Sequence, residues 1–587
     1  MKILVVMFIS LFVLIGCNGE EERLIHFETY QGSSMESVPM QSTLEDLDMP
    51  SRIGFTFEGW YFDQRLDEPF TQEGLAEKYE DETIKEITLY ASWTPLYSFT
   101  SYGDGYIIRG FFDEPFETVH IPETINDRPV LAIAGYAFDN DSIINEVYIP
   151  EGVTVIGVGA FQGSSISSVI FEGTPALEEI KLNAFSDTKR LKEIEIPASV
   201  ISIESNVFSG SSVETVTFAK NAQLKTLDGF QNMSYLKSIH IPASVEIISA
   251  LVFSGAERLE QVTFEEGSQV QRIEEGAFRG PNRIRELEIP ASVQYIGVYA
   301  FRESTRLHTV TFEEGSRLEE IMHGAFQGTR SLTEITIPAN VMYIGKDAFR
   351  VSAFSTLEKV VFEENSQLVG IDNGAFAFSA LKGELDIPDS VEFIGDEAFR
   401  QTMLSAINFG QNSQLKAIGE GAFYGSFIEQ FELPEHVEFI GMSAFYNTYF
   451  LETLSFGNNV LIDVLGNEMF AYNGAIERLI VPDHIRTTDF LTFAHMAALM
   501  HIEFGADFEY LAPLTFKNSS QLETVIFHRT DGIVEMSLGE DSEESPFLGV
   551  SDHLIIYVPD ALYDDYLADG VWSQFAQHIE RLSNYQA

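Results

Sequence analysis

Short runs of alternating apolar and polar residues recur along most of the chain. Residues 191–197, for example, read Leu-Lys-Glu-Ile-Glu-Ile-Pro. Because successive side chains of a strand point to opposite faces, we expect Ile194 and Ile196 to point inward and Glu193 and Glu195 to point outward. Each run therefore predicts a short strand with one buried face and one solvated face.

A phenylalanine follows each run, usually after a small residue, as in Ala300-Phe301. This dipeptide suits a short helical or 3₁₀ turn that packs against the next unit. Seventeen such phenylalanines lie 22 to 27 residues apart, namely Phe138, Phe161, Phe185, Phe208, Phe230, Phe253, Phe278, Phe301, Phe326, Phe349, Phe376, Phe399, Phe423, Phe445, Phe470, Phe493 and Phe516. A single unit cannot bury its own apolar side, so the units are expected to stack into a solenoid. At about 4.8 Å per stacked strand, seventeen units span on the order of 80 Å.

Two kinds of unit alternate along the array. A proline closes the strand in roughly every second unit, at Pro122, Pro150, Pro197, Pro242, Pro290, Pro338, Pro388, Pro434 and Pro482. In the intervening units phenylalanine is the last strand residue, and a Glu-Glu-Gly-Ser turn follows, as at residues 265–268 and 313–316. The array is therefore a double repeat.

The recurring pattern Leu-x-x-Ile-x-Ile-Pro-x-x-Val-x-x-Ile-Gly-x-x-Ala-Phe resembles the BspA-type leucine-rich repeat, and residues 335–349 match it well. The resemblance covers about residues 98–550. It implies a mainly β, elongated leucine-rich-repeat solenoid with short helical or 3₁₀ turns. We assign residues 96–552 to this array and interpret residues 98–137 as its opening unit.

The ends of a stack of this kind expose apolar surface and unpaired strand edges, so they require covering elements. Residues 553–587 contain a strand-like run at 555–559 and a helical pattern at 563–582 that includes Trp572 and Phe575. This segment resembles the closing cap of the same family. We therefore expect it to cover the C-terminal end of the stack.

Residues 24–95 differ from the array in composition and contain strand-like runs at 25–27 and 87–91. The sequences Gly-Phe-Thr-Phe-Glu-Gly-Trp-Tyr at 54–61 and Leu-Tyr-Ala-Ser-Trp at 89–93 resemble the Listeria/Bacteroides repeat, also called the B-repeat of internalin-like surface proteins. The resemblance implies a small β-grasp-like module.

Three large aromatic residues of this module, Trp60, Tyr61 and Trp93, allow two interpretations. They could form a patch on which a ligand stacks, or they could form the core. A module this small needs large aromatic side chains to bury enough apolar surface, which favours the core.

The N-terminal residues have the layout of an export signal. Residues 1–16 contain Lys2, an apolar stretch at 3–15 and Gly16, and this stretch is too short to span a bilayer comfortably. The sequence Leu-Ile-Gly-Cys ending at Cys17 resembles the lipobox of bacterial lipoproteins, which implies cleavage before Cys17 and a diacylglyceryl group on its thiol. Residues 17–23 then form a lipidated tether, and two acyl chains suffice for stable anchoring. The alternative is an uncleaved signal with a buried cysteine.

The cysteine count and the net charge exclude several classes of protein. Cys17 is the single cysteine, so the chain forms no internal disulfide and no multi-cysteine metal site. The 90 acidic and 35 basic residues give a formal net charge of -55, which repels nucleic acids and anionic lipid surfaces. We therefore expect no nucleic-acid partner and membrane contact through the lipid anchor only. The charge serves either solubility or a cationic partner.

The chain lacks the motifs that carry common enzyme chemistry. It contains no His-Glu-x-x-His sequence, no Gly-x-Ser-x-Gly elbow and no phosphate loop, so we expect neither an enzyme nor a cofactor. His484, His495 and His501 come nearest to a cluster, but their spacing reflects neighbouring repeats rather than a ligand set. The acidic run at 539–544 lacks the alternation of a calcium-binding EF-hand loop, and a mobile acidic insertion is the favoured interpretation.

The outward strand positions form the candidate ligand face, because a solenoid aligns them into one continuous surface. They read mostly Thr, Ser and carboxylates, with few aromatics, which weakens the case for sugar stacking. Each residue taken singly also fits an ordinary solvated strand. The candidate residues are Glu193, Glu195, Thr215, Thr217, Glu286, Glu288, Thr309, Thr311, Glu384 and Asp386.

These features favour an exported, lipid-anchored cell-surface protein that binds a protein or envelope-polymer ligand. The family resemblance supplies the idea of adhesion. The sequence pattern supplies export, anchoring and an extended surface. A structural spacer of the envelope is the alternative, which exposed hydrophobic positions on one face would favour, and none is evident in the sequence. An enzyme is the third and least favoured class.

Overall fold

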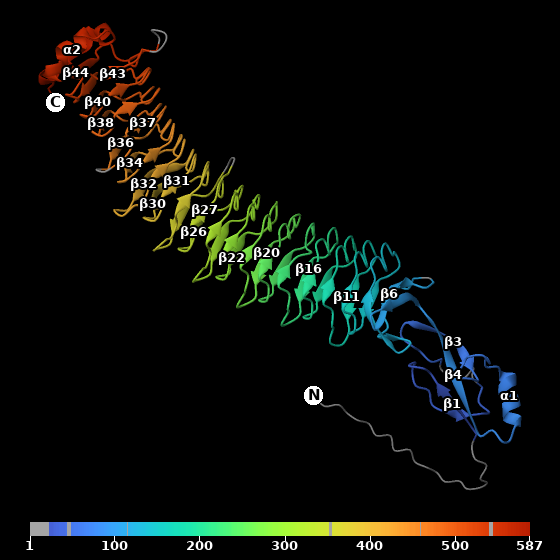
Figure 1. Ribbon diagram of the computed structural model, residues 1–587. Coiled ribbons are helices and arrows are strands. Elements are labelled where there is room, and N and C mark those ends of the chain that lie inside the picture. Colours follow the sequence, from blue (N-terminus) through green and yellow to red (C-terminus); the bar gives the residue numbers. More distant parts are fainter. Residues whose placement is uncertain are drawn as a thin grey trace.

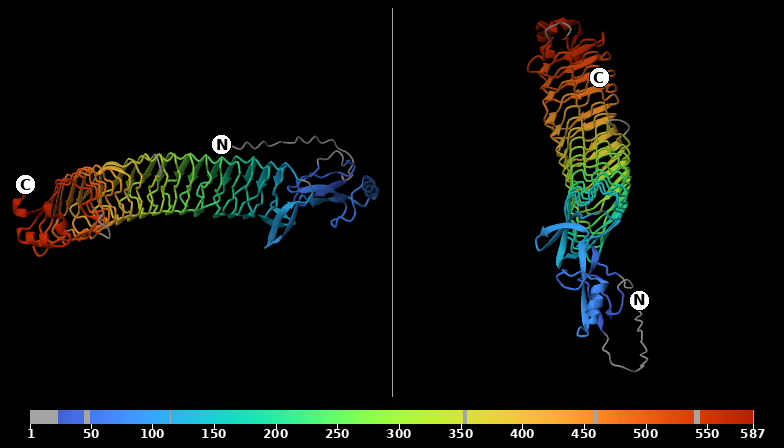
Figure 2. Two further views of the ribbon diagram at one scale, coloured as in Figure 1. Left: turned by 90° about the horizontal axis from the view of Figure 1, so that it is seen from above. Right: turned by 90° about the vertical axis from the view of Figure 1, so that its right-hand side faces the viewer.

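The computed structural model describes residues 23–43, 49–113, 115–351, 355–457, 460–538 and 544–586. The chain forms an elongated rod (Figure 1) in which a small N-terminal unit is followed by a long stack of similar turns and a helical C-terminal cap. Two further views show the turns lying side by side along a gently bent axis (Figure 2).

The N-terminal unit is a mixed four-stranded sheet with one helix. The strand order is β2-β1-β4-β3, where β1 and β4 are parallel and the other pairs are antiparallel. Its elements are β1 (Leu24–Glu28), β2 (Val38–Pro39), β3 (Phe55–Tyr61), α1 (Gln72–Glu80) and β4 (Glu86–Pro95). The helix is capped at its N-terminus by the Thr71 hydroxyl, which accepts a hydrogen bond from the Gly74 N–H.

Trp60 and Trp93 belong to the packing of this unit. The Trp60 ring lies 5.0 Å from the Phe27 ring, and the Trp93 indole N–H donates to the Thr29 carbonyl at 2.9 Å. Tyr61 is half-buried on β3. Both tryptophans are half-buried and pack against the hydrophobic cores, which favours the interpretation as packing residues.

A hairpin opens the array and covers the first phenylalanine of the stack. Tyr97 and Phe111 contact the Phe138 ring at centroid distances of 6.4 Å and 5.2 Å. The elements of this region are β5 (Tyr97–Tyr102), β6 (Gly105–Phe111), β7 (Thr118–His120), β8 (Thr124–Ile125) and β9 (Arg128–Ile133).

Each turn of the array contributes one long strand, and these strands form parallel ladders along the rod. In β14 the side chains alternate between exposed and buried, with Glu193 and Glu195 outside and Ile194 and Ile196 inside, as predicted. The long strands are β10 (Glu146–Ile149), β12 (Ser168–Phe171), β14 (Glu193–Ile196), β16 (Thr215–Phe218), β18 (Ser238–Ile241), β20 (Gln261–Phe264), β22 (Glu286–Ile289), β24 (Thr309–Phe312), β26 (Glu334–Ile337), β28 (Lys359–Phe362), β30 (Lys382–Ile387), β32 (Met403–Phe409), β34 (Gln430–Leu433), β36 (Thr453–Phe456), β38 (Arg478–Val481), β40 (His501–Phe504), β42 (Thr524–Phe527) and β44 (Ile555–Val558).

A second set of two-residue strands forms further parallel ladders, which begin at β9. These short strands are β11 (Val155–Ile156), β13 (Glu179–Ile180), β15 (Ser202–Ile203), β17 (Thr226–Leu227), β19 (Ile247–Ile248), β21 (Arg272–Ile273), β23 (Tyr295–Ile296), β25 (Glu320–Ile321), β27 (Tyr343–Ile344), β29 (Gly370–Ile371), β31 (Phe393–Ile394), β33 (Ala417–Ile418), β35 (Phe439–Ile440), β37 (Val464–Leu465), β39 (Thr487–Thr488), β41 (Tyr510–Leu511) and β43 (Glu535–Met536). Their second residue is buried in each case, so they close the core opposite the long strands.

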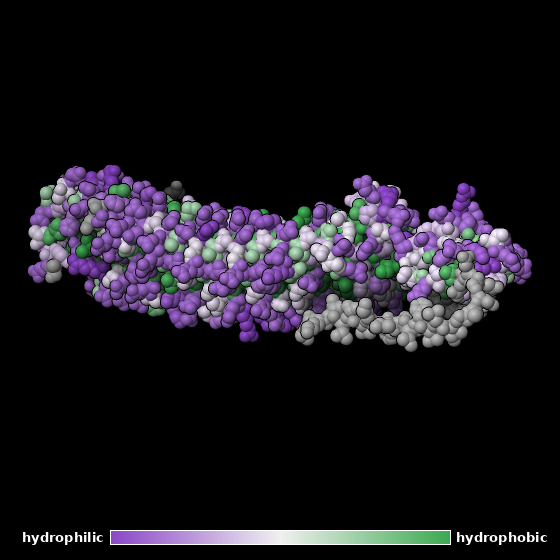
Figure 3. All heavy atoms as spheres, turned by 90° about the horizontal axis from the view of Figure 1, so that it is seen from below, coloured by the Kyte–Doolittle hydropathy of each residue, from purple (hydrophilic) through white to green (hydrophobic). Residues whose placement is uncertain are grey.

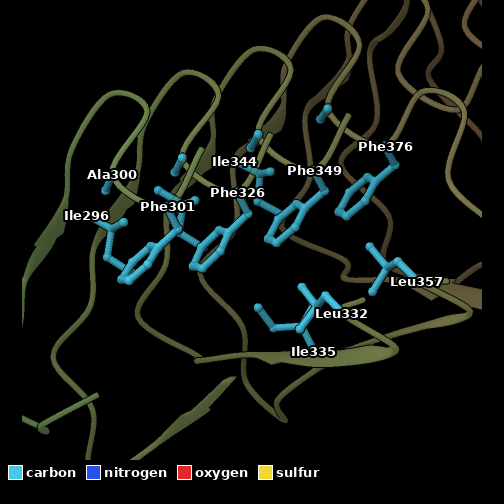
Figure 4. Close-up of a cluster of buried hydrophobic side chains, with 14 of the residues drawn as sticks. Ile296, Ala300, Phe301, Phe326, Leu332, Ile335, Ile344, Phe349, Leu357 and Phe376 are labelled. Atoms are coloured by element: carbon cyan, nitrogen blue, oxygen red, sulfur yellow. The ribbon is translucent and has the colours of Figure 1, made fainter. Parts of the chain in front are cut away.

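The predicted phenylalanines fill the space between these ladders. All seventeen are buried, and in the middle of the rod their rings are nearly parallel, with Phe301 and Phe326 5.0 Å apart and Phe326 and Phe349 5.2 Å apart. Figure 4 shows these rings side by side, each from a successive turn. The prediction of a phenylalanine stack is confirmed.

The Ala-Phe segments are hydrogen-bonded turns whose N–H groups serve two purposes. The Ala300 N–H donates within the turn to Gly297 at 3.1 Å, whereas the Phe301 N–H donates to the Ala325 carbonyl of the next unit at 2.7 Å. The residue before the alanine adopts left-handed backbone, as at Tyr299 with φ 56°. Because every second N–H bonds to the neighbouring unit, the segment cannot continue as a helix.

The C-terminal cap consists of η3 (Asp560–Leu562), α2 (Tyr563–Ala568), η4 (Trp572–His578), β45 (Ile579–Arg581) and η5 (Leu582–Asn584). Trp572 and Tyr566 are buried, and both bond to the backbone of Val534. The indole N–H donates to the Val534 carbonyl at 2.6 Å, and the Val534 N–H donates to the Tyr566 hydroxyl at 2.9 Å. The helical prediction for residues 563–582 is wrong at β45, which instead adds a parallel strand beside β44.

Candidate binding face

The outward side chains of the long strands form one surface, which we call the long-strand face. Eight of the ten candidate residues are exposed there, and Thr215 and Thr309 are half-buried. Adjacent strands place a carboxylate beside a threonine, since Glu193 lies opposite Thr215 and Glu288 opposite Thr311. Because like charges on neighbouring strands destabilise a sheet, this alternation spaces the carboxylates two units apart.

The turns that border this face change past the middle of the array. In the units of β20, β24 and β28, Glu265, Glu313 and Glu363 follow the last phenylalanine of the strand. Each carboxylate accepts the backbone N–H of the alanine after the proline of the preceding unit, at 2.9, 3.0 and 2.9 Å. The glutamate side chain therefore covers the edge of the face and ties two units together.

In the units after β28 the acidic residue and the small residue exchange positions. Glycine occupies the turn at Gly410, Gly457 and Gly505, and the residue after the preceding proline is acidic, as at Asp389 and Asp483. The Asp483 carboxylate accepts the Ala506 N–H at 2.9 Å, so the link between units is kept with its partners reversed. A Cβ on Gly410 would lie 2.0 Å from the Asp389 carboxylate, which explains the need for glycine beside this acid.

A groove of about 880 Å³ lies where the glutamates are missing. We call it the β34 groove, because the outward residues of β34 form the middle of its floor and those of β32 and β36 flank it. Its walls are the turns at 410–414 and 434–436. A second hollow of about 450 Å³ adjoins it at Gly457 and continues to β40.

Amide and hydroxyl groups dominate the β34 groove. Asn408 donates both of its amide protons to neighbouring carboxylates, to Glu384 at 3.2 Å and to Asp386 at 2.9 Å. Its carbonyl oxygen therefore remains as an acceptor. Two of the predicted face residues, Glu384 and Asp386, thus border the groove and orient one of its side chains.

Glu503 is the centre of a charge cluster at the far end of the second hollow. Its carboxylate, 16% exposed, contacts Arg478 at 2.5 Å, His501 at 2.8 Å and His528 at 3.2 Å. Burial acts to raise the pKa of Glu503, but the hydrogen bonds from the two histidines and the arginine outweigh it and hold the pKa below its ordinary value. The sequence does not reveal this cluster, because its members lie on three different strands or turns that are far apart along the chain.

The sequence shows no exposed hydrophobic positions gathered on one face, whereas the structure has such a cluster. Phe427 and Phe450 stack on each other at 5.1 Å with 47% and 46% of their surface exposed, and Tyr449 beside them is 57% exposed. Figure 3 shows hydrophobic residues at scattered positions on a mostly hydrophilic surface seen from below. A buried residue directly precedes each part of this cluster, with Ser426 before Phe427 and Thr448 before Tyr449.

The short strands carry a second row of aromatic residues that the sequence analysis did not single out. Tyr343 and Phe439 are 47% and 58% exposed. The Phe393 ring lies over Gly370, where a Cβ would approach it to 2.1 Å. Aromatic residues recur at this position in four successive proline units, Tyr295, Tyr343, Phe393 and Phe439, and this recurrence could have revealed the row.

The repeats match the family model described as the BspA type leucine rich repeat region, at residues 109–228, 226–355, 315–426, 352–473 and 416–537. Together these matches cover most of the chain. The chain belongs to the BspA-type leucine-rich repeat family. No curated protein sequence matches the chain.

Several solved structures of bacterial leucine-rich repeat proteins are similar to this BspA-type chain. A protein from Bacteroides ovatus is 18% identical, with 83% of this chain and 97% of that chain covered and a TM-score of 0.36. A leucine-rich cell surface protein from Faecalibacterium prausnitzii is 22% identical, with 70% and 93% covered and a TM-score of 0.33. A leucine-rich repeat protein of T. pallidum is 25% identical, with 36% and 90% covered and a TM-score of 0.28.

Three other sequence predictions concern residues outside the ten candidate ligand residues. Cys17 and the acidic run from 539 to 543 lie outside the described residues. His495 stacks on Tyr472 at 4.3 Å, where burial lowers its pKa, whereas His501 bonds to Glu503 on the long-strand face. The histidines thus occupy different surfaces of the BspA-type array.

Two features of the described part of the chain bear on metal and membrane binding. Within that part, no three His, Cys, Asp or Glu side chains are placed so that they could hold a metal ion. No described helix has both the length and the apolar character that crossing a bilayer requires.

Proposed function

We propose that this BspA-type chain is a lipid-anchored bacterial cell-surface protein whose long-strand face binds a protein or envelope-polymer ligand. The observation that carries the proposal is the long row of mostly polar, outward side chains, from Glu193 to Asp386 and on into the β34 groove. Stacked repeats turn such a row into a surface long enough to engage a large partner at many points. The chain acts by binding rather than by catalysis.

The anchor in this proposal is a lipid on Cys17. Its support is the lipobox-like sequence that ends at this residue, the single cysteine of the chain. A diacylated cysteine holds a protein stably at a membrane surface. The rod-shaped array would then present its long-strand face well beyond the lipid headgroups.

A spacer or self-associating role is the second candidate, favoured by the exposed cluster of Phe427, Tyr449 and Phe450. Contiguous exposed apolar residues on a soluble protein mark contact surfaces. If this role holds, the full chain forms oligomers that Phe427→Ser with Phe450→Ser abolishes. Sedimentation velocity of both proteins would show it.

The binding proposal is tested with cells that display the full chain. Purified matrix proteins and purified envelope polymers are added to cells carrying the wild type or Cys17→Ser. We expect at least one ligand to bind wild-type cells and to be lost from the variant, because the unlipidated chain is released. If the whole panel fails to bind while the serine variants abolish oligomers, the spacer role replaces the binding role.

A further inference from the structure

The β34 groove has the size of a site for a short segment of a ligand. Its volume of about 880 Å³ falls in the range of ~300–1,000 Å³ that is usual for small-molecule and cofactor sites. The groove crosses β32, β34 and β36, which are spaced by about 4.8 Å each. About three residues of an extended chain, at ~3.3 Å per residue, would span this floor.

The groove offers acceptor oxygens and negative charge. Asn408 is left with its carbonyl oxygen, because both of its amide protons are engaged. The Gln414 amide donates to the Asn412 carbonyl at 2.9 Å, so its side-chain oxygen is also left to accept. Glu432 stands exposed on the floor, and the described lining residues include no Lys or Arg to neutralise it. These acceptors and this negative charge favour a ligand that supplies N–H donors and positive charge.

A sugar chain fits this groove less well. Of the two phenylalanines in its lining, Phe431 is buried and Phe409 is half-buried against the core, so they offer little ring surface on which a sugar could stack. A neutral glycan also leaves the Glu432 carboxylate without a cation. The acidic net charge of -55 favours a basic partner further.

We propose that the β34 groove binds an extended, lysine- or arginine-containing segment of a protein ligand. The proposal rests on the proposed function and specifies the chemistry of its partner. The glycine turns at Gly410 and Gly457 open the site, Glu432 pairs with the basic side chain, and Asn408 accepts an N–H of the segment. The hollow that adjoins the groove at Gly457 gives the segment room to continue toward β40.

The experiment measures fluorescence anisotropy of a labelled peptide of alternating lysine and serine with the full chain carrying Cys17→Ser. The counter-probes are a peptide of alternating glutamate and serine and an uncharged glucose oligosaccharide. We expect the basic peptide alone to bind at physiological ionic strength. Absence of its binding, or stronger binding of the oligosaccharide, overturns the proposal.

Gly410→Glu separates occupancy of the groove from general attraction to an acidic surface. The variant adds a negative charge, so general attraction predicts tighter binding of the basic peptide. It also fills the groove with the side chain that other turns carry, so our proposal predicts binding weaker by about tenfold. Tighter or unchanged binding overturns the proposal.

Glu432→Gln keeps the test decisive if Gly410→Glu fails to fold. The matched control is Glu535→Gln, which removes one exposed charge from short strand β43 in a distant unit. We expect Glu432→Gln to weaken peptide binding about tenfold and Glu535→Gln less than twofold. If both variants weaken binding equally, the peptide binds a diffuse acidic surface and the proposal for the groove is wrong. Ligand capture by cells that display the full chain tests the proposed function separately.

Discussion

Replacing Phe301 by alanine tests whether the array is a stack held by local contacts. The ring is 1% exposed and lies between Phe278 at 5.1 Å and Phe326 at 5.0 Å, nearly parallel to both. Burying such a side chain contributes about 1.5–3 kcal/mol, and each ring pair adds about 0.5–1.5 kcal/mol. The expected loss is therefore about 3–5 kcal/mol, the usual range for a buried Phe→Ala change.

Segment-resolved hydrogen exchange measures where this loss falls. Because each unit contacts mainly its neighbours, we expect faster exchange in the units of Phe278 and Phe326 and unchanged exchange near Phe161 and Phe493. Phe439→Ala is the matched control, since this ring is 58% exposed and should cost under about 1 kcal/mol. Uniform loss of protection from end to end would refute the picture of local stacking.

Three further predictions address the anchor, the face and the charge cluster. Cys17→Ser should move the protein from the detergent phase to the aqueous phase in a partitioning assay, and equal partitioning of both proteins would rule out the anchor. Ligand capture should weaken with added salt and on changing both Glu286 and Glu288 to Gln, because surface charges are screened over about 8 Å at physiological ionic strength; indifference to both changes would move the site elsewhere. Glu503→Gln should lower the free energy of unfolding at neutral pH. Because the folded pKa of Glu503 lies below its unfolded value, this contribution is present above the unfolded pKa and is lost as pH falls through the folded pKa, so denaturant titrations of the two proteins should converge at low pH. A constant difference across this pH range would contradict the assignment.

The stacked phenylalanines could be predicted because a large apolar residue that recurs at a fixed interval indicates repeated units with a shared core. One more member was missed. Phe547 lies 5.7 Å from Phe516 and extends the stack, but 31 residues separate the two in sequence, which exceeds the interval of the other units. The interval alone cannot reveal a unit that carries an insertion.

The turns before each phenylalanine were less predictable. Gly324 signals left-handed backbone, with φ 58°, because glycine adopts it without a steric cost. Tyr299 and Leu251 adopt the same conformation at equivalent positions, with φ 56° and 57°. At these residues the hydrogen bonds to neighbouring units impose the left-handed conformation, and the local sequence does not indicate it.

The β34 groove could not be predicted from the strand pattern. It depends on an exchange between residues of adjacent units, in which Glu363 and Ala339 are replaced by Gly410 and Asp389. The change from glutamate to glycine is visible in the sequence. Its effect on the surface depends on which turns of adjacent units lie side by side, and the register of the folded array sets this pairing.

Blocking one face at a time shows whether the long-strand face captures the ligand. In a Cys17→Ser background, a single cysteine is introduced at Thr311 or Thr453 on the long-strand face, or at Glu320 or Val464 on the short strands of the same units, and is coupled to a polyethylene glycol chain. If the long-strand face binds the ligand, we expect ligand capture by the full chain to be lost with either long-strand conjugate and retained with either short-strand conjugate. Capture that survives both long-strand conjugates, or that is lost only with a short-strand conjugate, would contradict it.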